Sequence, residues 1–197
     1  MGNQLRSVAV FCGSSPGNDP KIIEEAYNLG KILGQKKIKL IYGGSKLGLM
    51  GELARGVLEN NGKVTGVIPR FLRIKEVVHT GLTELVLVET MHERKLKMHE
   101  ISDGIIVLPG GFGTMEEFFE MITWSQLGLH QKPIGMLNST GFYDDLLSFF
   151  QTMVKKEFLQ ADNRDLLLVS NDIDDLLHLM ENYEATVKPK WMNKSQT

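Results

Sequence analysis

Short apolar runs rich in β-branched residues alternate with longer amphipathic runs along most of this chain. Strands that alternate with helices of about 10–15 residues are typical of βαβ units and of a mainly parallel sheet. Because such crossovers are right-handed, the pattern predicts a doubly wound, Rossmann-like α/β fold in a single domain. The predicted strands are Ser7–Cys12, Lys39–Tyr42, Lys63–Ile68, Glu84–Glu89, Gly104–Leu108, Pro133–Leu137 and Leu166–Val169. The predicted helices are Pro20–Gln35, Leu49–Asn60, Met91–Ile101, Met115–Leu127, Tyr143–Lys155 and Ile173–Tyr183.

Length and charge narrow the class of protein. We expect residues 1–185 of the 197 to form the folded domain and residues 186–197 to form a polar C-terminal tail. The formal net charge of −2 gives no basic footprint for nucleic acid, and no apolar run approaches the roughly 20 residues of a membrane span. The five histidines lack metal-ligand spacing such as H-E-x-x-H, and Cys12 is the single cysteine. These features predict a cytoplasmic protein without metal, cofactor, membrane or nucleic-acid partners.

Glycine is concentrated where ligands of doubly wound sheets bind, beyond the carboxyl ends of the strands. The loops CGSSPG, YGGSKLGLMG and PGGFGTMEE follow the first, second and fifth predicted strands. Glycine exposes backbone amides and helix N-termini carry partial positive charge, so phosphate is the natural ligand, with plain tight turns as the alternative. None of the loops matches the dinucleotide fingerprint or the P-loop, which disfavours a dehydrogenase or an NTPase. The candidate phosphate-binding residues are Gly13, Ser14, Gly43, Gly44, Gly111, Phe112, Gly113 and Thr114.

Glu117 admits a structural and a functional interpretation. Thr114 and Glu117 have the form T-x-x-E, a capping box in which Glu117 only returns a hydrogen bond to the helix start; Thr90 and Glu93 repeat that form. A helical wheel instead places Glu117 nearly opposite the core-facing side, next to an outer apolar patch that predicts a second subunit as its cover. The predicted core stripe is Met115, Phe118, Phe119 and Ile122, and the predicted outer patch is Met121 and Trp124.

Two adjacent cations, Arg94 and Lys95, lie in the first turn of the helix that follows the fourth strand. A solvated basic face is the simpler interpretation of an isolated Arg-Lys pair. Cations near a helix N-terminus oppose the helix dipole, however, and residues kept at an electrostatic cost are more often functional.

The motifs together resemble one family. PGGFGTMEE fits P-G-G-x-G-T-x-x-E, and MHERK precedes it by one helix and one strand. With FCGSS, GGSKLGLMG and ITWSQLGLHQKPIGMLN, they resemble the LOG family, the cytokinin riboside 5′-monophosphate phosphoribohydrolases, whose members have often carried the mistaken label lysine decarboxylase. The resemblance runs from about Val8 to Leu159.

Membership would imply hydrolysis of the N-glycosidic bond of a purine nucleoside 5′-monophosphate, often with an N6-prenylated adenine, to free base and ribose 5-phosphate. It would also imply a homodimer with sites near the subunit interface. By position in the motifs, Arg94 and Glu117 match the catalytic pair. The matching substrate contacts are Glu76, Lys95, Gly111, Phe112, Gly113, Thr114, Met115, Glu116 and Thr123.

The chemistry suits these residue types. Cleavage of an N-glycosidic bond builds oxocarbenium charge, which a carboxylate such as Glu117 can stabilise or answer with an activated water. Arg94 has a fixed charge and is a poor acid, so it is expected to hold ribose or phosphate or to orient Glu117. Two other functions stay open: a general AMP or purine-nucleotide nucleosidase, and a non-catalytic nucleotide or cofactor carrier. A carrier needs only the phosphate-binding loops, so the presence of both Arg94 and Glu117 favours an enzyme.

Overall fold

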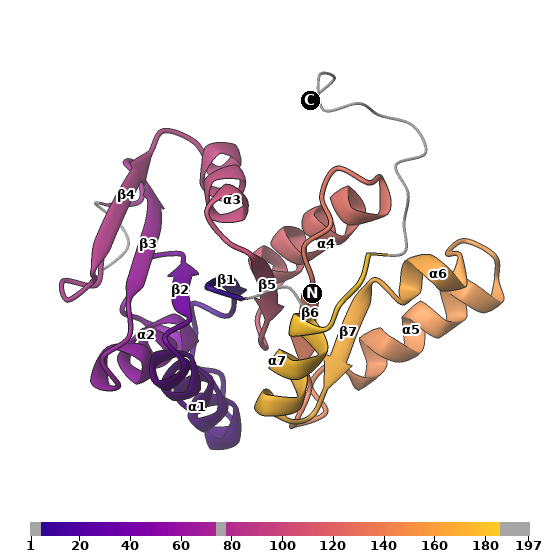
Figure 1. The fold of residues 1–197 in the computed structure, drawn as a ribbon, viewed down its shortest axis with the longest axis horizontal. Helices are drawn as coiled ribbons and strands as arrows, with labels where there is room; N and C mark the ends of the chain where they lie inside the picture. The colour runs from indigo at the N-terminus through magenta and orange to yellow at the C-terminus, as the bar shows by residue number, and fades with distance from the viewer. Residues whose placement is uncertain (1–4, 74–77, 186–197) are drawn as a thin grey trace.

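The strands expected from the sequence form one sheet in the computed structural model, which describes residues 5–73 and 78–185 (Figure 1). All six pairings between neighbouring strands are parallel. The strands are β1 (Ser7–Phe11), β2 (Lys39–Tyr42), β3 (Val64–Pro69), β4 (Glu84–Val88), β5 (Gly104–Val107), β6 (Ile134–Leu137) and β7 (Leu167–Ser170). The helices are α1 (Pro20–Lys36), α2 (Gly48–Glu59), α3 (Met91–Glu100), α4 (Phe112–Gln126), α5 (Asp144–Lys155), α6 (Ala161–Arg164) and α7 (Ile173–Glu181).

The order of the strands confirms the predicted doubly wound fold. The sheet runs β4-β3-β2-β1-β5-β6-β7, so the chain moves outward from β1 in one direction and then returns to continue on the other side. Ligands of such sheets bind where the order reverses, here between β1 and β5. The register pairs Phe11 with Val107, so the loops that begin at Cys12 and Leu108 leave the sheet side by side.

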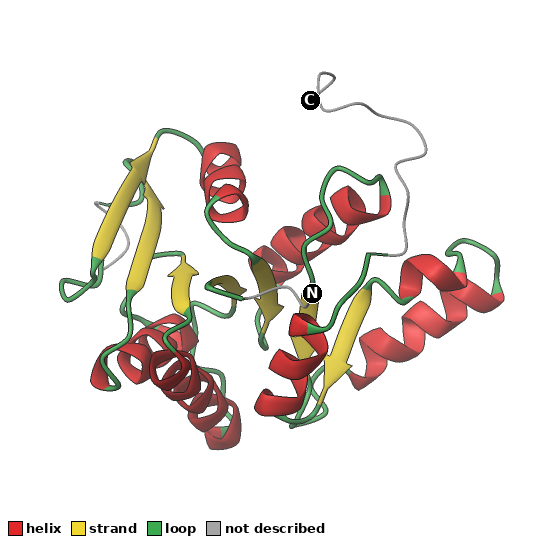
Figure 2. Ribbon diagram, in the orientation of Figure 1, coloured by secondary structure: helices red, strands yellow, loops and turns green. Residues whose placement is uncertain are grey.

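Two layers of helices cover the sheet (Figure 2). Alternate residues of each buried strand point to opposite faces. On β1, Val8 and Val10 join a core with α1, α2 and α7, whereas Ala9 and Phe11 join a core with α3, α4 and α5. Burial on both faces explains why these strands are continuously apolar in the sequence.

Helix α1 illustrates how local sequence sets the ends of an element. Its N-cap is Asp19, whose carboxylate accepts a hydrogen bond from the amide of Lys21 at 2.9 Å, and Pro20 occupies the first helical position. It ends at Lys36, and the C-cap Lys37 adopts a left-handed conformation with φ of 59°. The predicted helix therefore forms almost unchanged.

The start of α4 differs from the sequence prediction. The helix begins at Phe112 instead of Met115, with Gly111 as an N-cap that provides no side-chain hydrogen bond. Thr114 is therefore the third helical residue and is buried, so the predicted capping box between Thr114 and Glu117 is wrong. The other capping position is confirmed, because Thr90 accepts a hydrogen bond from the amide of Glu93 at 3.1 Å.

The predicted outer patch of α4 is also wrong in part. Met121 is 0% exposed and belongs to the core, while Phe119 from the predicted core stripe is exposed. Trp124 is partly buried, with its ring edge-on to that of His99. The wheel misplaced the stripe because hydropathy does not count the small polar residues that complete the buried face. That face consists of Thr114, Phe118, Met121 and Ser125.

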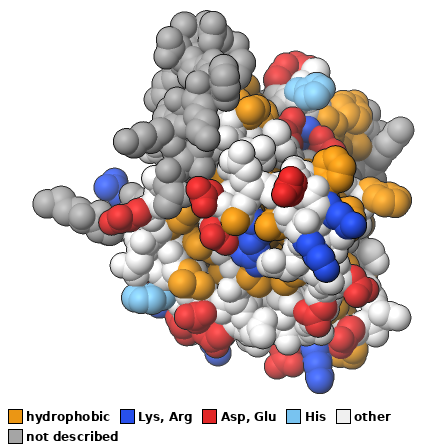
Figure 3. Space-filling model, turned by 90° about the vertical axis from the view of Figure 1, so that its right-hand side faces the viewer, with side chains coloured by type: hydrophobic (Ala, Val, Ile, Leu, Met, Phe, Trp, Pro, Cys, Tyr) orange, Lys and Arg blue, Asp and Glu red, His pale blue; other side chains and the backbone are white. Residues whose placement is uncertain are grey.

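The described surface carries both signs of charge. On the face shown in Figure 3, acidic and basic side chains are interspersed with hydrophobic ones. Among the residues that the structure describes, no helix combines the length and apolar character needed to cross a membrane. The predicted tail at residues 186–197 and the predicted substrate contact Glu76 lie outside the described residues.

Candidate active site

The glycine loops meet around a pocket of about 370 Å³ at the carboxyl edge of β1 and β5. The amide of Gly13 donates to the carbonyl of Pro109 at 3.0 Å, which joins the first loop to the fifth. A Cβ on Gly48 would lie 2.3 Å from the carbonyl oxygen of Ser14, so the second loop packs directly against the first. The pocket lining includes Gly13, Ser14, Leu49, Gly110, Gly111 and Phe142.

The glycines of the PGGFG loop have different reasons to be glycine. A Cβ on Gly110 would lie 2.1 Å from the hydroxyl of Thr114, so glycine is needed there for packing. A Cβ on Gly111 or Gly113 would meet nothing within 4 Å, and neither residue has a positive φ. Neither packing nor backbone geometry therefore requires glycine at these two positions. Open space beside bare backbone is what a closely approaching ligand needs.

The first turn of α4 begins at this pocket, because its N-cap Gly111 is part of the lining. The first intrahelical bond runs from the amide of Met115 to the carbonyl of Gly111, so the amides of Phe112, Gly113 and Thr114 have no partner within the helix. Phe112 itself is 97% exposed. Such a turn favours an anion through both its donors and its dipole.

Arg94 is buried at the second glycine loop. Only 6% of the residue is exposed, and its Nη2 donates to the carbonyl of Gly43 at 3.0 Å. A Cβ on Gly43 would lie 2.0 Å from that nitrogen, so the absent side chain makes room for the guanidinium. The Nε of Arg94 is buried without a hydrogen-bond partner. Gly43 therefore positions Arg94, a role that the sequence did not indicate. It is not among the residues that line the pocket.

Lys95 joins α3 to α4 through two carboxylates. The buried ammonium contacts the carboxylate of Glu116 and lies 3.0 Å from Oε2 of Glu120. Sequence reasoning named Lys95 and Glu116 but missed Glu120. Glu120 could have been found from its position four residues after Glu116, because residues four apart lie on one face of a helix. The two predicted substrate contacts are therefore partners of each other in this structure.

Glu117 lies among these charges. Burial raises the pKa of Glu117 to about 7, the cations of Arg94 and Lys95 act against this rise, and Glu116 adds to it. The thiol of Cys12 is close by, since burial and the Glu117 carboxylate both raise the pKa of Cys12. Near neutral pH the Glu117 carboxyl group is therefore divided between its acid and its base form.

The remaining predicted substrate contacts do not lie together. Met115 is partly buried and packs against the core. Gly44 has a φ of 80°, and its carbonyl accepts a hydrogen bond from the amide of His79. Thr123 is exposed and follows Thr114 by nine residues, or about 13 Å along α4. Within one chain, Thr123 thus lies far from the first turn of α4. Among residues 5–73 and 78–185, no group of three or more His, Cys, Asp or Glu side chains could hold a metal ion.

Known proteins share both this sequence and this fold. Residues 50–180 match the family model described as "Possible lysine decarboxylase". The chain is 46% identical over 170 residues to a cytokinin riboside 5′-monophosphate phosphoribohydrolase of Rhodococcoides fascians, covering 86% of each protein. It is 41% identical over 181 residues to such an enzyme of Arabidopsis thaliana, covering 92% of this chain and 85% of the relative.

A solved structure of lower identity shares the fold. The molybdenum cofactor binding protein of Rippkaea orientalis superposes with a TM-score of 0.67 at 20% identity, over 88% of this chain and 93% of that one. That likeness concerns the fold alone, whereas the identities of 41–46% extend over nearly the whole chain. This chain belongs to the family of the cytokinin riboside 5′-monophosphate phosphoribohydrolases.

Proposed function

We propose that the protein hydrolyses the N-glycosidic bond of a purine nucleoside 5′-monophosphate, with preference for an N6-prenylated adenine, and releases the free base and ribose 5-phosphate. The observation that carries the proposal is Glu117, whose carboxyl group burial holds between its acid and base forms beside Arg94, on the helix α4 that begins at the glycine loop. The activity that the curated relatives carry in their names supports the same reaction.

The 5′-phosphate binds at the first turn of α4. The amides of Phe112, Gly113 and Thr114 donate to its oxygens, and Gly111 and Gly113 leave the space for close approach. The helix dipole adds to the attraction. A nucleoside without the phosphate lacks this anchor and is a poor substrate.

The carboxylate of Glu117 stabilises the oxocarbenium charge and activates the attacking water. The water oxygen bonds to C1′ of the ribose and its proton passes to Glu117, while the C1′–N bond breaks with its electron pair leaving on the base, which takes up a proton from solvent. Arg94 is locked by Gly43 and holds the reacting carboxylate or the ribose in place. The base form of Glu117 is the active one.

The pH dependence of the reaction follows from Glu117. Because its pKa lies at about 7, log kcat/KM should rise with a slope near one as pH increases from 5 to 7 and then level off. The profile is measured from pH 5 to pH 9 with base release as the readout. A rate that is independent of pH below 7 would contradict this role for Glu117.

A substrate panel tests the function itself. It contains isopentenyladenosine monophosphate, AMP, GMP, CMP and the dephosphorylated nucleosides, with free base and ribose 5-phosphate measured by chromatography. Release from the prenylated monophosphate well above AMP, with none from nucleosides, supports the proposal. Equal turnover of AMP makes the protein a general purine-nucleotide nucleosidase. Binding of nucleotide without any release over one day identifies a carrier.

The proposal includes a homodimer with a site completed by the partner chain. Phe119, Thr123 and Leu127 recur every fourth residue on the exposed side of α4, and Leu96 is exposed on α3. An apolar stripe of this kind favours a protein partner. The family resemblance makes Thr123 a substrate contact, and a second copy packed on this stripe would bring its own Thr123 to a site that Thr123 of the same chain does not approach.

Leu127→Asp should therefore yield monomers with little activity, because a carboxylate in an apolar interface loses its hydration without gaining a partner. Molar mass by light scattering and turnover are the two measurements. Leu179→Asp is the matched control, since Leu179 is exposed on α7 in the opposite helical layer. An unchanged mass for Leu127→Asp would exclude this face as the interface.

A further inference from the structure

Phe142 is an aromatic residue that lines the glycine-loop pocket and is still 48% exposed. Its neighbour Tyr143 is buried, and the hydroxyl of Tyr143 donates to the carbonyl of Leu108 at 2.6 Å. The two rings meet at right angles, with centroids 4.9 Å apart. One aromatic residue thus anchors the loop under the sheet edge while the next stands in the pocket wall.

The loop that carries Phe142 is held tightly by its own hydrogen bonds. The side chain of Asn138 accepts from the amide of Tyr143 at 2.8 Å and donates to Asp144 at 2.7 Å. Gly141 turns the chain with a φ of 74°, and its amide donates to the carbonyl of Asn138 at 3.2 Å. These hydrogen bonds fix the backbone of the turn that carries Phe142.

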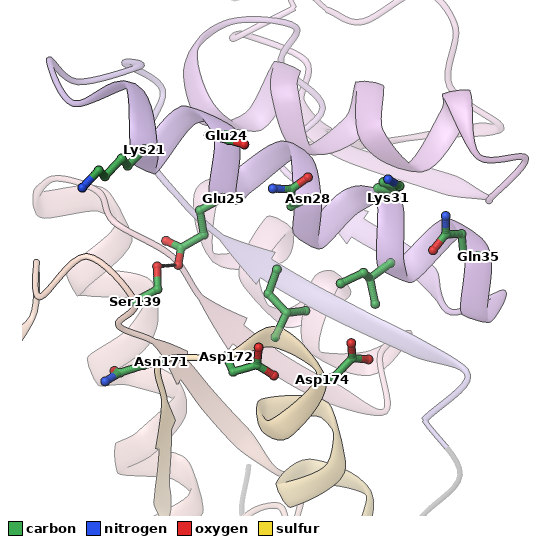
Figure 4. A pocket seen from close by; sticks show the side chains of 12 residues that line it. Lys21, Glu24, Glu25, Asn28, Lys31, Gln35, Ser139, Asn171, Asp172 and Asp174 are labelled. Carbon is green, nitrogen blue, oxygen red and sulfur yellow. Dashed lines mark hydrogen bonds between the residues drawn. The ribbon is translucent and has the colours of Figure 1, made fainter.

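A second pocket, shown in Figure 4, is lined in part by Ser139, which belongs to the same loop. There the hydroxyl of Ser139 donates to the carboxylate of Glu25, which extends from α1 and is only 7% exposed. The first turn of α1 also carries Ile22, which lines the pocket together with Phe142. The contact between Glu25 and Ser139 therefore ties two apolar walls of the pocket to each other.

The pocket lining combines two chemically different kinds of surface. Gly13, Gly110 and Gly111 contribute bare backbone, and Ile22, Leu49 and Phe142 contribute apolar side chains. A ligand that uses both kinds of surface has an anionic part and a flat or apolar part. A half-exposed aromatic ring on a fixed turn suits a heterocyclic base, because bases stack on aromatic side chains.

We propose that Phe142 is a specificity-determining residue on which the purine ring of the bound nucleotide stacks, so that the pocket distinguishes a nucleoside monophosphate from a phosphorylated sugar. This inference rests on the proposed function for the identity of the anionic part of the ligand. It assigns the base a wall at Phe142, four residues beyond Asn138, where the last of the family motifs ends.

The test compares two ligands that differ only in the base. Dissociation constants for AMP and ribose 5-phosphate are measured by calorimetry on Glu117→Gln protein, which keeps AMP intact, with and without Phe142→Ala. Stacking on one aromatic residue changes base affinity by about 10-fold or more. Phe142→Ala should weaken the affinity for AMP by that factor and leave the affinity for ribose 5-phosphate unchanged within about twofold. Phe142→Trp should restore the affinity for AMP. Phe158→Ala, at an exposed phenylalanine beyond α5, is the control and should change neither ligand.

Each other outcome decides the question. Equal weakening of both ligands would overturn the proposal, because Phe142 would then act only on the shape of the loop. No weakening of AMP would place the base against another wall. If the wild-type protein cleaves no nucleotide but Phe142→Ala still weakens AMP alone, the hydrolase assignment fails and the stacking role stands. Turnover of AMP that is indifferent to Phe142 would leave the hydrolase and remove the stacking role.

Discussion

Glu117→Gln should abolish turnover while the fold and most of the nucleotide affinity remain. The amide has the size of the carboxylic acid but can neither accept the proton of the attacking water nor oppose the oxocarbenium charge. Loss of a general base alone lowers kcat by about 10²–10⁴-fold. The proposed phosphate contacts lie on backbone amides of the first turn of α4, so the substitution leaves them in place.

The comparison requires kcat from base release, the dissociation constant for AMP and the melting temperature. Glu181→Gln is the control, because Glu181 is an exposed carboxylate at the end of α7, in the opposite helical layer. A kcat near that of the wild type would remove Glu117 from the chemistry. A simple capping role would not replace it, since α4 begins at Phe112, before Thr114.

Gly43→Ala should be nearly as damaging, although Gly43 does not line the pocket. The added Cβ would lie 2.0 Å from Nη2 of Arg94, and a buried guanidinium has little room to move aside. Arg94 would lose its hydrogen bond to the Gly43 carbonyl, which costs about 1–3 kcal/mol for a buried polar group. A shift of about 1 Å in a catalytic group lowers the rate by about 10²-fold. We therefore expect a lower melting temperature together with a large loss of kcat.

Gly113→Ala is the informative comparison for Gly43→Ala. A Cβ on Gly113 meets nothing within 4 Å, so the melting temperature should be unchanged. The methyl group would instead occupy the space that we propose for the phosphate, and KM for the nucleotide should rise. If Gly43→Ala behaves like Gly113→Ala, with normal stability and only a higher KM, Gly43 belongs to the phosphate site and is not the seat of Arg94.

The local features of this protein could be predicted from its sequence. Parallel strands buried on both faces are continuously apolar, and helices carry their own start and stop signals such as Asp19 and Pro20. The alternation of these elements limits a chain of this length to a doubly wound sheet, and the sheet then places the glycine loops at one edge. The motifs around Arg94 and Glu117 identified the family without any coordinates.

Only the tertiary structure decided which residues meet. Arg94 and Gly43 are 51 residues apart, and Ser139 and Glu25 are 114 apart, so no local pattern could pair them. The same holds for the pairing of Lys95 with Glu120 and for the entry of Met121 into the core. Periodicity reports which face of a helix is apolar, but the element packed against each face determines burial. Burial in turn sets the protonation of Glu117, and with it the chemistry that the site can perform.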